Sequence, residues 1–368
     1  SWRAAGSIAD TSFEELRELC RTSDTQVPLA LGMAGLLMQH THHGRNRESL
    51  RLIPEYVGLL DAIGNPDLNV ALLYPAIYAK HEACEMSAVL QLTQRVIDLA
   101  DGDARKGNIL TGSPLAFATV MRASAKCALG QPNWKREFDQ AIAFARVDPT
   151  TYVSTVMFKY ILGVPTGALV ADEQALKHTA DALETARRCS EDFAVHMAEL
   201  ARGIALVSSD NGDRSAGYTL LSQARSAAVG GRFSVTFIPV VDLHIAAEKA
   251  RTDDIDGAIT LLRDVIAEQL ETGSALYLGA ATSGLVESLL ARGRELDLFE
   301  AQDAIEALAA VPTDPGFVLY QLSLLKTRAL LSKSLRDTSG YRKYADEYLA
   351  LAQTLEFEGH TAAALAPE

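Results

Sequence analysis

The chain has no uninterrupted run of about 18 apolar residues, which a membrane-spanning helix would require. Its first residues also lack the charged and then apolar layout of a secretory signal peptide. Basic residues do not gather in one segment, and the formal net charge is −13, so the clustered Lys and Arg that bind phosphate backbones are missing. We therefore expect a soluble, cytoplasmic protein with no membrane partner and no nucleic-acid partner.

Cysteine is scarce and scattered. The four cysteines, Cys20, Cys84, Cys127 and Cys189, never form a Cys-x-x-Cys pair. Neither a zinc site nor a redox dithiol is indicated, because both need such closely spaced sulfur ligands. We expect four buried, reduced thiols.

Motifs that carry familiar chemistries are also missing. Phosphate binding in nucleotide sites needs a glycine-rich loop that ends in Gly-Lys-Ser or Gly-Lys-Thr, and the segment from Gly102 to Asn108 has its glycines and lysine in the wrong order. A Gly-x-Ser-x-Gly nucleophile elbow does not occur. Asp253 and Asp254 stand where helix caps are expected. The sequence thus predicts neither a catalytic residue nor a cofactor.

What the chain does have is a repeat. A helix-like run of apolar and polar residues restarts with a small or anchoring residue at a spacing of about 42 residues, long enough for two helices and two turns. These anchors are Ser49, Ala88, Phe138, Ala175, Gly217, Ala258, Ala301 and Tyr344. Self-similarity at this length is typical of stacked helical hairpins, which build extended surfaces more often than reaction centres.

Apolar and amphipathic helices alternate within each repeat. The first helix of each pair is apolar around most of its circumference, as expected for an inner helix. The second helix, which carries the anchor, has a polar face that is expected to be exposed to solvent. The apolar segments run over 29–40, 68–84, 115–129, 152–162, 193–208, 235–250, 275–292 and 318–333. Pro54 and Pro75 fall inside helical patterns and predict local kinks. A longer connection is expected over 105–114.

The fold expected from this pattern is all-α, a TPR-like α-solenoid of about eight helical hairpins plus an unpaired N-terminal helix. We expect residues 1–368 to form one array, with 25–368 as about eight helix pairs. Residues 1–24 are expected to be a half-hairpin, since Thr11-Ser12-Phe13-Glu14-Glu15 gives a capping-box start and no partner helix precedes it. On this interpretation the first half of that hairpin lies upstream, in a longer parent protein.

Polar residues interrupt the apolar first helices and are the candidate binding set. They are Tyr78, His81, Arg122, Lys126, Tyr152, Tyr160, Arg202 and His244. If the first helices line a concave side, these side chains would form a mildly cationic, aromatic strip that suits an anionic peptide or a small anionic ligand. The alternative is that each is a hydrogen-bonded polar group buried between repeats.

One histidine cluster, His40, His42 and His43, could bind a metal ion. His40 and His43 could face one way at a helix end, but a zinc site needs a third or fourth ligand and carboxylates that orient the rings. No carboxylate follows before Glu48. A polar C-terminal turn favoured by the helix dipole is the simpler interpretation.

Several stretches resemble one known family. One is the entry segment Glu18-Leu19-Cys20 followed by Ser23-Asp24-Thr25. The others are Gly112-Ser-Pro-Leu-Ala-Phe-Ala-Thr-Val-Met-Arg122, Cys127-Ala-Leu-Gly130-Gln-Pro-Asn-Trp134, Gly203-Ile-Ala-Leu-Val207, Ile238-Pro-Val-Val-Asp242 and Leu355-Glu-Phe-Glu-Gly-His360. Together they are similar to the C-terminal TPR-like region of actinobacterial, largely mycobacterial, multidomain adenylate/guanylate cyclase and ATPase signalling regulators. The resemblance spans nearly the whole chain.

The resemblance implies a parent with a class III cyclase domain and a P-loop ATPase domain upstream of this array. The metal-binding aspartates and the phosphate loop of those domains have no matching positions here, so no catalytic residue is carried over. The chain also departs from the family's usual Phe-Glu-Gly-His-Ile-Ala ending at Thr361. An output domain in the parent is inferred from analogy alone.

The leading hypothesis is therefore a non-catalytic sensor or protein-interaction module of a larger signalling protein, which binds a peptide or small ligand on its concave face. One alternative is a scaffold for self-association of the parent. A less favoured one is a helical enzyme with a metal site near His40 to His43.

Overall fold

The structure is a computed structural model that describes residues 14–15, 17–18, 26–189 and 191–365. Within these residues it consists of α-helices and one short 3-10 helix, without any strand. The expected all-α class is confirmed. The predicted half-hairpin over 1–24 lies almost entirely outside the described residues. No helix in the described part of the chain is both long enough and apolar enough to cross a bilayer.

Neighbouring helices pair along the chain, each second helix packing on the first. The pairs are α2 (Val27–His42) with α3 (Asn46–Ile63), α4 (Pro66–Leu72) and α5 (Tyr74–Glu82) with α6 (Met86–Ala100), α7 (Pro114–Ala128) with α8 (Trp134–Ala145), α9 (Pro149–Gly163) with α10 (Glu173–Cys189), α11 (Asp192–Ser208) with α12 (Arg214–Val229), η1 (Val235–Phe237) and α13 (Ile238–Arg251) with α14 (Ile255–Thr272), α15 (Leu278–Arg292) with α16 (Glu295–Ala309), and α17 (Val318–Ser334) with α18 (Thr338–Thr354). A short helix, α19 (Glu358–Leu365), follows the last pair.

The two helices of a pair differ in burial as their sequences predict. The first helix α7 is buried on almost every side, because it contacts α5 and α9 as well as its partner α8. The second helix α10 buries only one stripe, which includes Ala175, Ala182 and Ala186. Contacts from first helix to first helix continue through α9, α11, α13, α15 and α17. The first helices thus form a continuous inner row.

Most anchors of the repeat are packing residues. Ser49, Phe138, Ala175, Gly217, Ala258 and Ala301 are buried, whereas Ala88 and Tyr344 are half-buried. The expected kink at Pro75 is seen as the break between α4 and α5 at Leu73, while α3 runs through Pro54 without interruption. The predicted long connection lies between α6 and α7.

Of the four cysteines, Cys20 lies outside the described residues, and the other three are not all buried. Cys84 and Cys127 are buried free thiols, and burial raises the pKa of both thiols. Cys189, at the end of α10, is an exposed free thiol, so the expectation of burial is wrong there. A helix end that faces solvent leaves no second element to cover the side chain.

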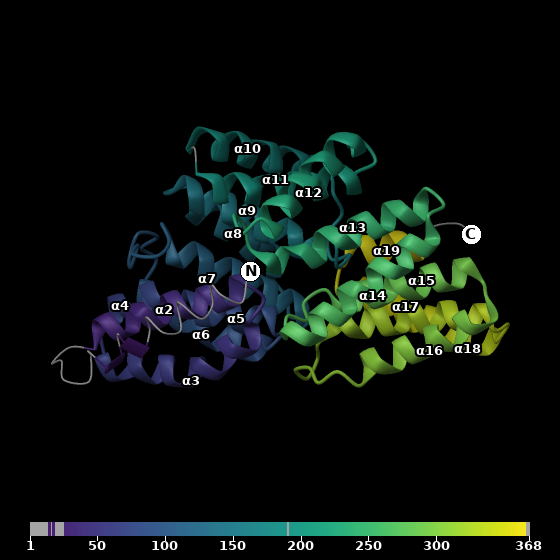
Figure 1. Cartoon of the computed structure of the whole chain (residues 1–368), viewed down its shortest axis with the longest axis horizontal. Coiled ribbons are helices and arrows are strands. Elements are labelled where there is room, and N and C mark those ends of the chain that lie inside the picture. The colour runs from purple at the N-terminus through teal and green to yellow at the C-terminus, as the bar shows by residue number, and fades with distance from the viewer. Residues whose placement is uncertain (1–13, 16, 19–25, 190, 366–368) are drawn as a thin grey trace.

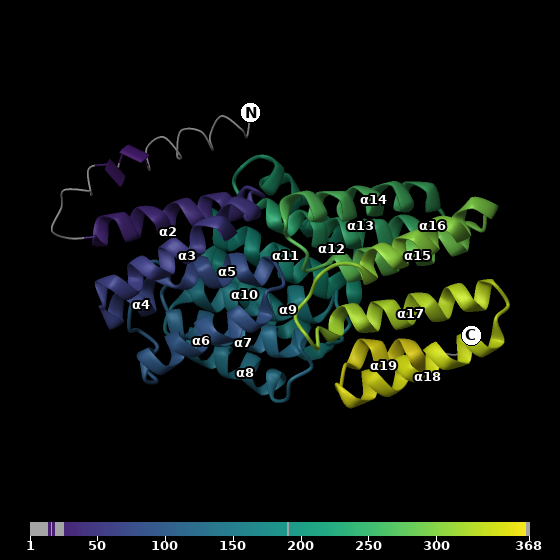
Figure 2. The same cartoon turned by 90° about the horizontal axis from the view of Figure 1, so that it is seen from below.

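The row of helices curls so that distant parts of the chain meet. In Figure 1 the first pairs lie at lower left, the middle pairs at the top and the last pairs at lower right; Figure 2 shows α17, α18 and α19 grouped below α13 to α16. Arg47 of α3 donates to the carbonyls of Leu270 (2.7 Å) and Glu271 (2.9 Å) at the end of α14. The Ala275 amide donates to the Glu82 carbonyl at 2.8 Å. The first two pairs therefore touch the sixth and seventh.

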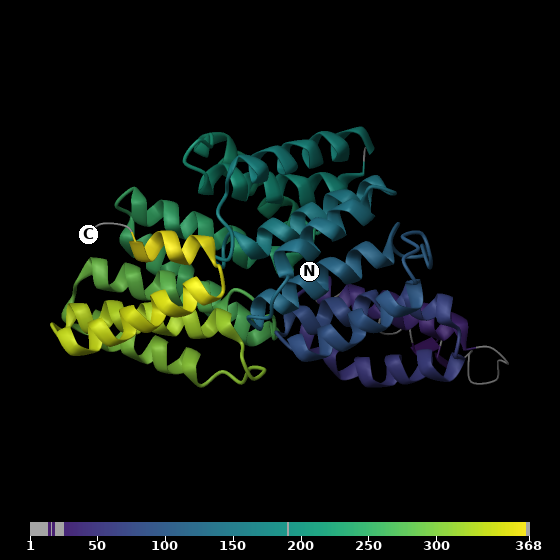
Figure 3. The ribbon, with the colours of Figure 1, turned by 180° about the vertical axis from the view of Figure 1, so that it is seen from behind.

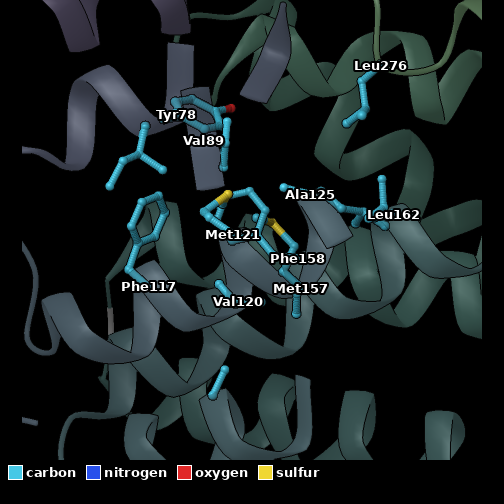
Figure 4. Packing of buried hydrophobic residues seen from close by; sticks show 14 of the residues in the cluster. Tyr78, Val89, Phe117, Val120, Met121, Ala125, Met157, Phe158, Leu162 and Leu276 are labelled. Atoms are coloured by element: carbon cyan, nitrogen blue, oxygen red, sulfur yellow. The ribbon is translucent and has the colours of Figure 1, made fainter. Parts of the chain in front are cut away.

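Closure buries the inner row of the first half of the chain. Figure 4 shows side chains of α5, α6, α7 and α9, among them Tyr78, Met121 and Phe158, in one cluster with Leu276, which precedes α15. The hydroxyl of Tyr277 reaches across this core and donates to the Ile161 carbonyl at 3.0 Å. A compact interior has replaced the open inner surface that the repeat alone suggests.

Candidate functional site

The inner row is not filled along its whole length. A groove of about 680 Å³ opens between α13, α15 and α17 on one side, and the α9–α10 loop (164–172) and α19 on the other. We call it the inner groove. Leu276 lines it and also belongs to the core cluster of Figure 4, so the groove starts where the close packing of the interior ends.

Small side chains keep the inner groove open. Ala247 of α13 and Ala280 and Gly284 of α15 line it, and Ala247 is exposed to solvent. Gly279 is buried at the edge, where a Cβ would come within 2.8 Å of the Ser323 hydroxyl oxygen. Larger residues at these positions would fill the space, so the sequence of α13 and α15 itself creates the groove.

One wall is a clasp between α19 and the α9–α10 loop. His360 Nε2 lies 2.7 Å from the Thr166 carbonyl oxygen, and Nδ1 lies 2.8 Å from the Tyr348 hydroxyl. Because a carbonyl only accepts, Nε2 carries the proton and Nδ1 accepts from Tyr348. Burial lowers the pKa of His360 to about 4, with the nearby charge of Lys326 acting in the same direction and the Thr166 bond against it. The ring is neutral and both of its nitrogens are used.

Backbone contacts tighten this clasp. The Glu358 and His360 amides donate to the carbonyls of Ala168 (3.2 Å) and Gly167 (3.2 Å). Gly167 has a φ of +73°, and a Cβ there would lie 2.8 Å from the His360 ring. Only glycine adopts this positive φ without strain and also leaves room for the His360 ring. Figure 3 shows α19 from behind, at the yellow end of the chain.

The clasp also reaches the third helix pair. Glu358 accepts from Lys135 Nζ at 2.6 Å, and Phe357, fully buried, packs edge-on against Trp134 with 5.6 Å between ring centroids. The Phe357-Glu358-Gly359-His360 ending therefore joins the C-terminus to both α8 and the α9–α10 loop. Its role in the fold is to close the array.

Few polar groups that line the inner groove lack a hydrogen-bond or ion-pair partner within the described residues. Lys326 is paired with Glu287 at 2.6 Å, and the Tyr320 hydroxyl donates to the Ala275 carbonyl at 2.6 Å. His244 differs, because its Nε2 atom is buried and has no hydrogen-bond partner among the described residues. Burial, and secondarily the charge of Arg214, lower the pKa of His244 to about 4, so this ring is neutral. The groove is an apolar cleft with one unsatisfied imidazole at its edge.

Two residues of the predicted binding strip are core residues instead. Tyr78 is buried, with its hydroxyl 2.8 Å from the Thr236 hydroxyl. His81 is buried against the Ser124 hydroxyl, and burial lowers its pKa to about 4. Curling of the array, which brings residue 236 beside residue 78, has covered the surface that the sequence left open.

The other predicted residues are also engaged, and they lie apart. Arg122 and Lys126 both bond Glu137 of α8 (2.9 and 2.5 Å) and line a separate groove with Arg95. The remaining contacts pair Tyr152 with the Arg146 guanidinium, Tyr160 with His178 Nδ1 (2.9 Å), and Arg202 with the Leu176 carbonyl (2.6 Å). Only His244 lines the inner groove. The structure does not bring these residues into one continuous strip, because the side chains other than His244 contact neighbouring parts of the array.

The histidine cluster does not form a metal centre. His42 packs against the rings of Tyr78 and Phe193 (5.5 and 5.6 Å between centroids), and burial, with the charge of His43, lowers its pKa to about 4. His43 Nδ1 bonds back to the Gln39 carbonyl of its own helix at 2.8 Å. His40 is buried. Across the described ranges no three His, Cys, Asp or Glu side chains are grouped to hold a metal ion.

Sequence reasoning missed the residues that form the walls of the inner groove. Thr166 and Gly167 give no periodic signal, because they lie in a loop within the fourth pair. The Phe-Glu-Gly-His ending was conspicuous as a motif, but nothing in its spacing indicates a partner 194 residues earlier. The small residues of α13 and α15 gave no signal either, because they lie in segments that the sequence marks only as apolar first helices.

No protein-family model matches the chain, and no curated protein matches it. The similarity to cyclase and ATPase regulators thus remains a prediction from the sequence.

Proposed function

We propose that this chain is a TPR-like helical-repeat module that binds a peptide segment or a small ligand, with a largely apolar surface, in the inner groove. The observation that carries the proposal is the gap in the inner row. The row is close-packed from α2 to α9 but is left open by small residues on α13 and α15. Concave, mostly apolar clefts with few polar groups are typical ligand sites.

The inner groove is better suited to ligand binding than to catalysis. The groups that could act as acid, base or nucleophile are held by structural bonds, as the His360, Tyr320 and Lys326 contacts illustrate. The Nε2 atom of His244 remains available for one polar group of a ligand. We therefore propose a non-catalytic role, with His244 fixing the orientation of the bound molecule.

A ligand in the inner groove would contact two separate parts of the array. One wall belongs to α13 and α15, and the other is the clasp of α19 and the α9–α10 loop. A molecule that touches both walls favours the closed array, because binding shifts the population toward the state that offers more contacts. In a parent signalling protein of the cyclase or ATPase type, such closure would be the signal passed upstream.

A thermal-shift screen of peptides and metabolites on the whole chain tests this proposal, with two matched variants. Ala247→Phe places a ring in the groove from an exposed position, and Ala307→Phe places one on the outer helix α16. Hits should raise Tm by a few degrees at saturating concentration, lose that effect in Ala247→Phe and keep it in Ala307→Phe. The ligand site would be overturned by a screen without hits, or by hits that raise the Tm of Ala247→Phe as much as that of the unmodified chain.

The parental context needs a separate test. A cyclase domain and a phosphate-binding loop encoded directly upstream in the same reading frame would support the signalling role. An unrelated upstream sequence would remove that part of the proposal and leave the ligand site standing.

A second candidate function is self-association, favoured by α16. Leu296 and Phe299 are 76% and 65% exposed on one face of this helix. Light scattering of the chain and of Phe299→Glu tests this candidate. A monomer at high concentration would exclude it.

A further inference from the structure

A second groove lies outside the inner row. It has a volume of about 1130 Å³ and shares no lining residue with the inner groove. We call it the outer groove. Its lining comes from α11, α12, the end of α13 and the turn after α12: His196, Glu199, Arg214, Ser215, Tyr218, Thr219, Ser222, Gln223, Ser226, Arg232, Glu248 and Arg251.

One side of the outer groove is a stripe of polar groups on α12. Ser215, Thr219, Ser222 and Ser226 recur at helical spacing and are all exposed. The Thr219 hydroxyl donates a hydrogen bond to the carbonyl oxygen of Ser215, one turn earlier on α12, at 3.0 Å. The hydroxyls of Ser222 and Ser226 make no bond to the described protein and can donate to a ligand.

The opposite side holds an imidazole with one free nitrogen. His196 Nδ1 lies 2.8 Å from a Glu199 carboxylate oxygen, which can only accept, so Nδ1 carries a proton. The ring packs against Phe233 at 5.9 Å between centroids. Its Nε2 atom is buried and has no partner among the described residues. Buried polar atoms are normally bonded, so this atom can accept a partner from a water or a ligand.

Charge in the outer groove is unevenly balanced. Arg214 and Arg251 both bond the Glu248 carboxylate (3.2 and 2.6 Å), so both guanidinium groups at that end already have an anionic partner. Arg232 is exposed, and within the described chain its guanidinium makes no ion pair or hydrogen bond. It directly precedes Phe233, so its backbone is held beside the His196 ring. The His196 end therefore offers an unpaired arginine, while the Glu199 carboxylate there is bonded to Nδ1 of the imidazole.

We propose that the His196 end of the outer groove binds a small molecule through an oxyanion, either a phosphate or a carboxylate. The Arg232 guanidinium contacts the oxyanion directly, and Ser222 and Ser226 donate hydroxyl hydrogen bonds. The unpartnered Nε2 atom of His196 makes the remaining hydrogen bond to the bound molecule, while Glu199 holds the ring through Nδ1. Arginine and hydroxyl donors in this combination recognise planar or tetrahedral oxyanions by charge-assisted hydrogen bonds.

Isothermal titration at low ionic strength, with inorganic phosphate in one arm and malonate in the other, tests this site. We expect saturable binding in at least one arm, and the tighter arm identifies the oxyanion. Arg232→Gln should weaken that binding about tenfold or more, as loss of a charge-assisted contact does. Arg342→Gln, which removes an exposed arginine on α18, should leave that binding unchanged.

Nuclear magnetic resonance of the imidazole nitrogens adds a readout specific to His196. Addition of the tighter anion should shift Nε2 of His196 in the unmodified chain but not in Arg232→Gln. Absence of saturable binding in both arms, or equal weakening by Arg232→Gln and Arg342→Gln, would overturn the site. Because the two grooves share no residue, this result is independent of any ligand found in the inner groove.

Discussion

The imidazole of His360 donates from Nε2 to the backbone carbonyl of Thr166, 194 residues earlier, while its Nδ1 accepts from the Tyr348 hydroxyl. The first bond connects α19 to the loop inside the fourth helix pair, and the second fixes the His360 ring against α18. They hold the array closed and form one wall of the inner groove. The predictions below concern this closure and the interior that it creates.

Replacing His360 by Ala should destabilise the fold by about 2 kcal/mol, because two hydrogen bonds and a buried ring are lost. Urea unfolding measures the loss. Hydrogen exchange should also become faster for the amides of 164–172, which the clasp covers. Tyr348→Phe, which removes only one bond, should have a smaller effect of about 1 kcal/mol. Equal rates of hydrogen exchange at 164–172 in the unmodified chain, His360→Ala and Tyr348→Phe would contradict the role of the clasp.

Gly167→Ala should destabilise the protein more than Gly102→Ala does. Both glycines have positive φ, +73° and +78°, so both substitutions bring backbone strain of about 1 kcal/mol. Only at Gly167 does the new Cβ also meet the His360 ring, at 2.8 Å, whereas nothing lies within 4 Å at Gly102. The difference between the two free energies of unfolding isolates the contact. A difference near zero would show that the ring can move away freely.

Glu82→Gln should change how stability depends on pH. Glu82 is fully enclosed where α5 meets the segment before α15, and burial raises its pKa to about 8 from 4.5. A raised folded-state pKa means that the contribution to stability is fully present below pH 4.5 and is lost as pH rises toward 8. Within that window each pH unit should cost about 1.4 kcal/mol. Glutamine stays neutral and should remove this slope.

Urea unfolding at pH 5, 6.5 and 8 measures the Glu82 effect. Glu347→Gln, on the exposed face of α18, is the matched control and should retain the slope of the unmodified chain. If Glu82→Gln also retains it, the carboxyl titrates normally and the interior around it is wetter than its burial indicates.

Arg47→Ala should weaken the contact between the first and sixth helix pairs. Its guanidinium caps the carbonyls of Leu270 and Glu271, which have no partner within α14 at the helix end. We expect a loss of about 1 kcal/mol and faster exchange of amides near residue 275. Arg51→Ala, one turn further along α3 and exposed, is the control and should leave both quantities unchanged. Matching behaviour of the two variants would mean that the end-to-end contact contributes no stability.

The sequence determined the helices and their pairing. Apolar residues at three- and four-residue spacing set which face of each helix is buried, and the repeat of about 42 residues set how many helices fit between successive anchors. Both are local properties, so the range 318–333 expected from the pattern agrees closely with α17 (Val318–Ser334). The kink at Pro75 is local in the same sense, because it follows from a missing amide.

Only the tertiary structure decided which inner surface stays open. Tyr78 and His244 look alike in the sequence, each a polar residue on an apolar first helix. Curling of the array brings Thr236 to the Tyr78 hydroxyl, 158 residues away, while small residues on α13 and α15 leave space beside His244. Helical periodicity fixes which way a side chain points from its helix. Whether another part of the chain meets it depends on the summed rotation of eight successive pairs, which no local spacing encodes.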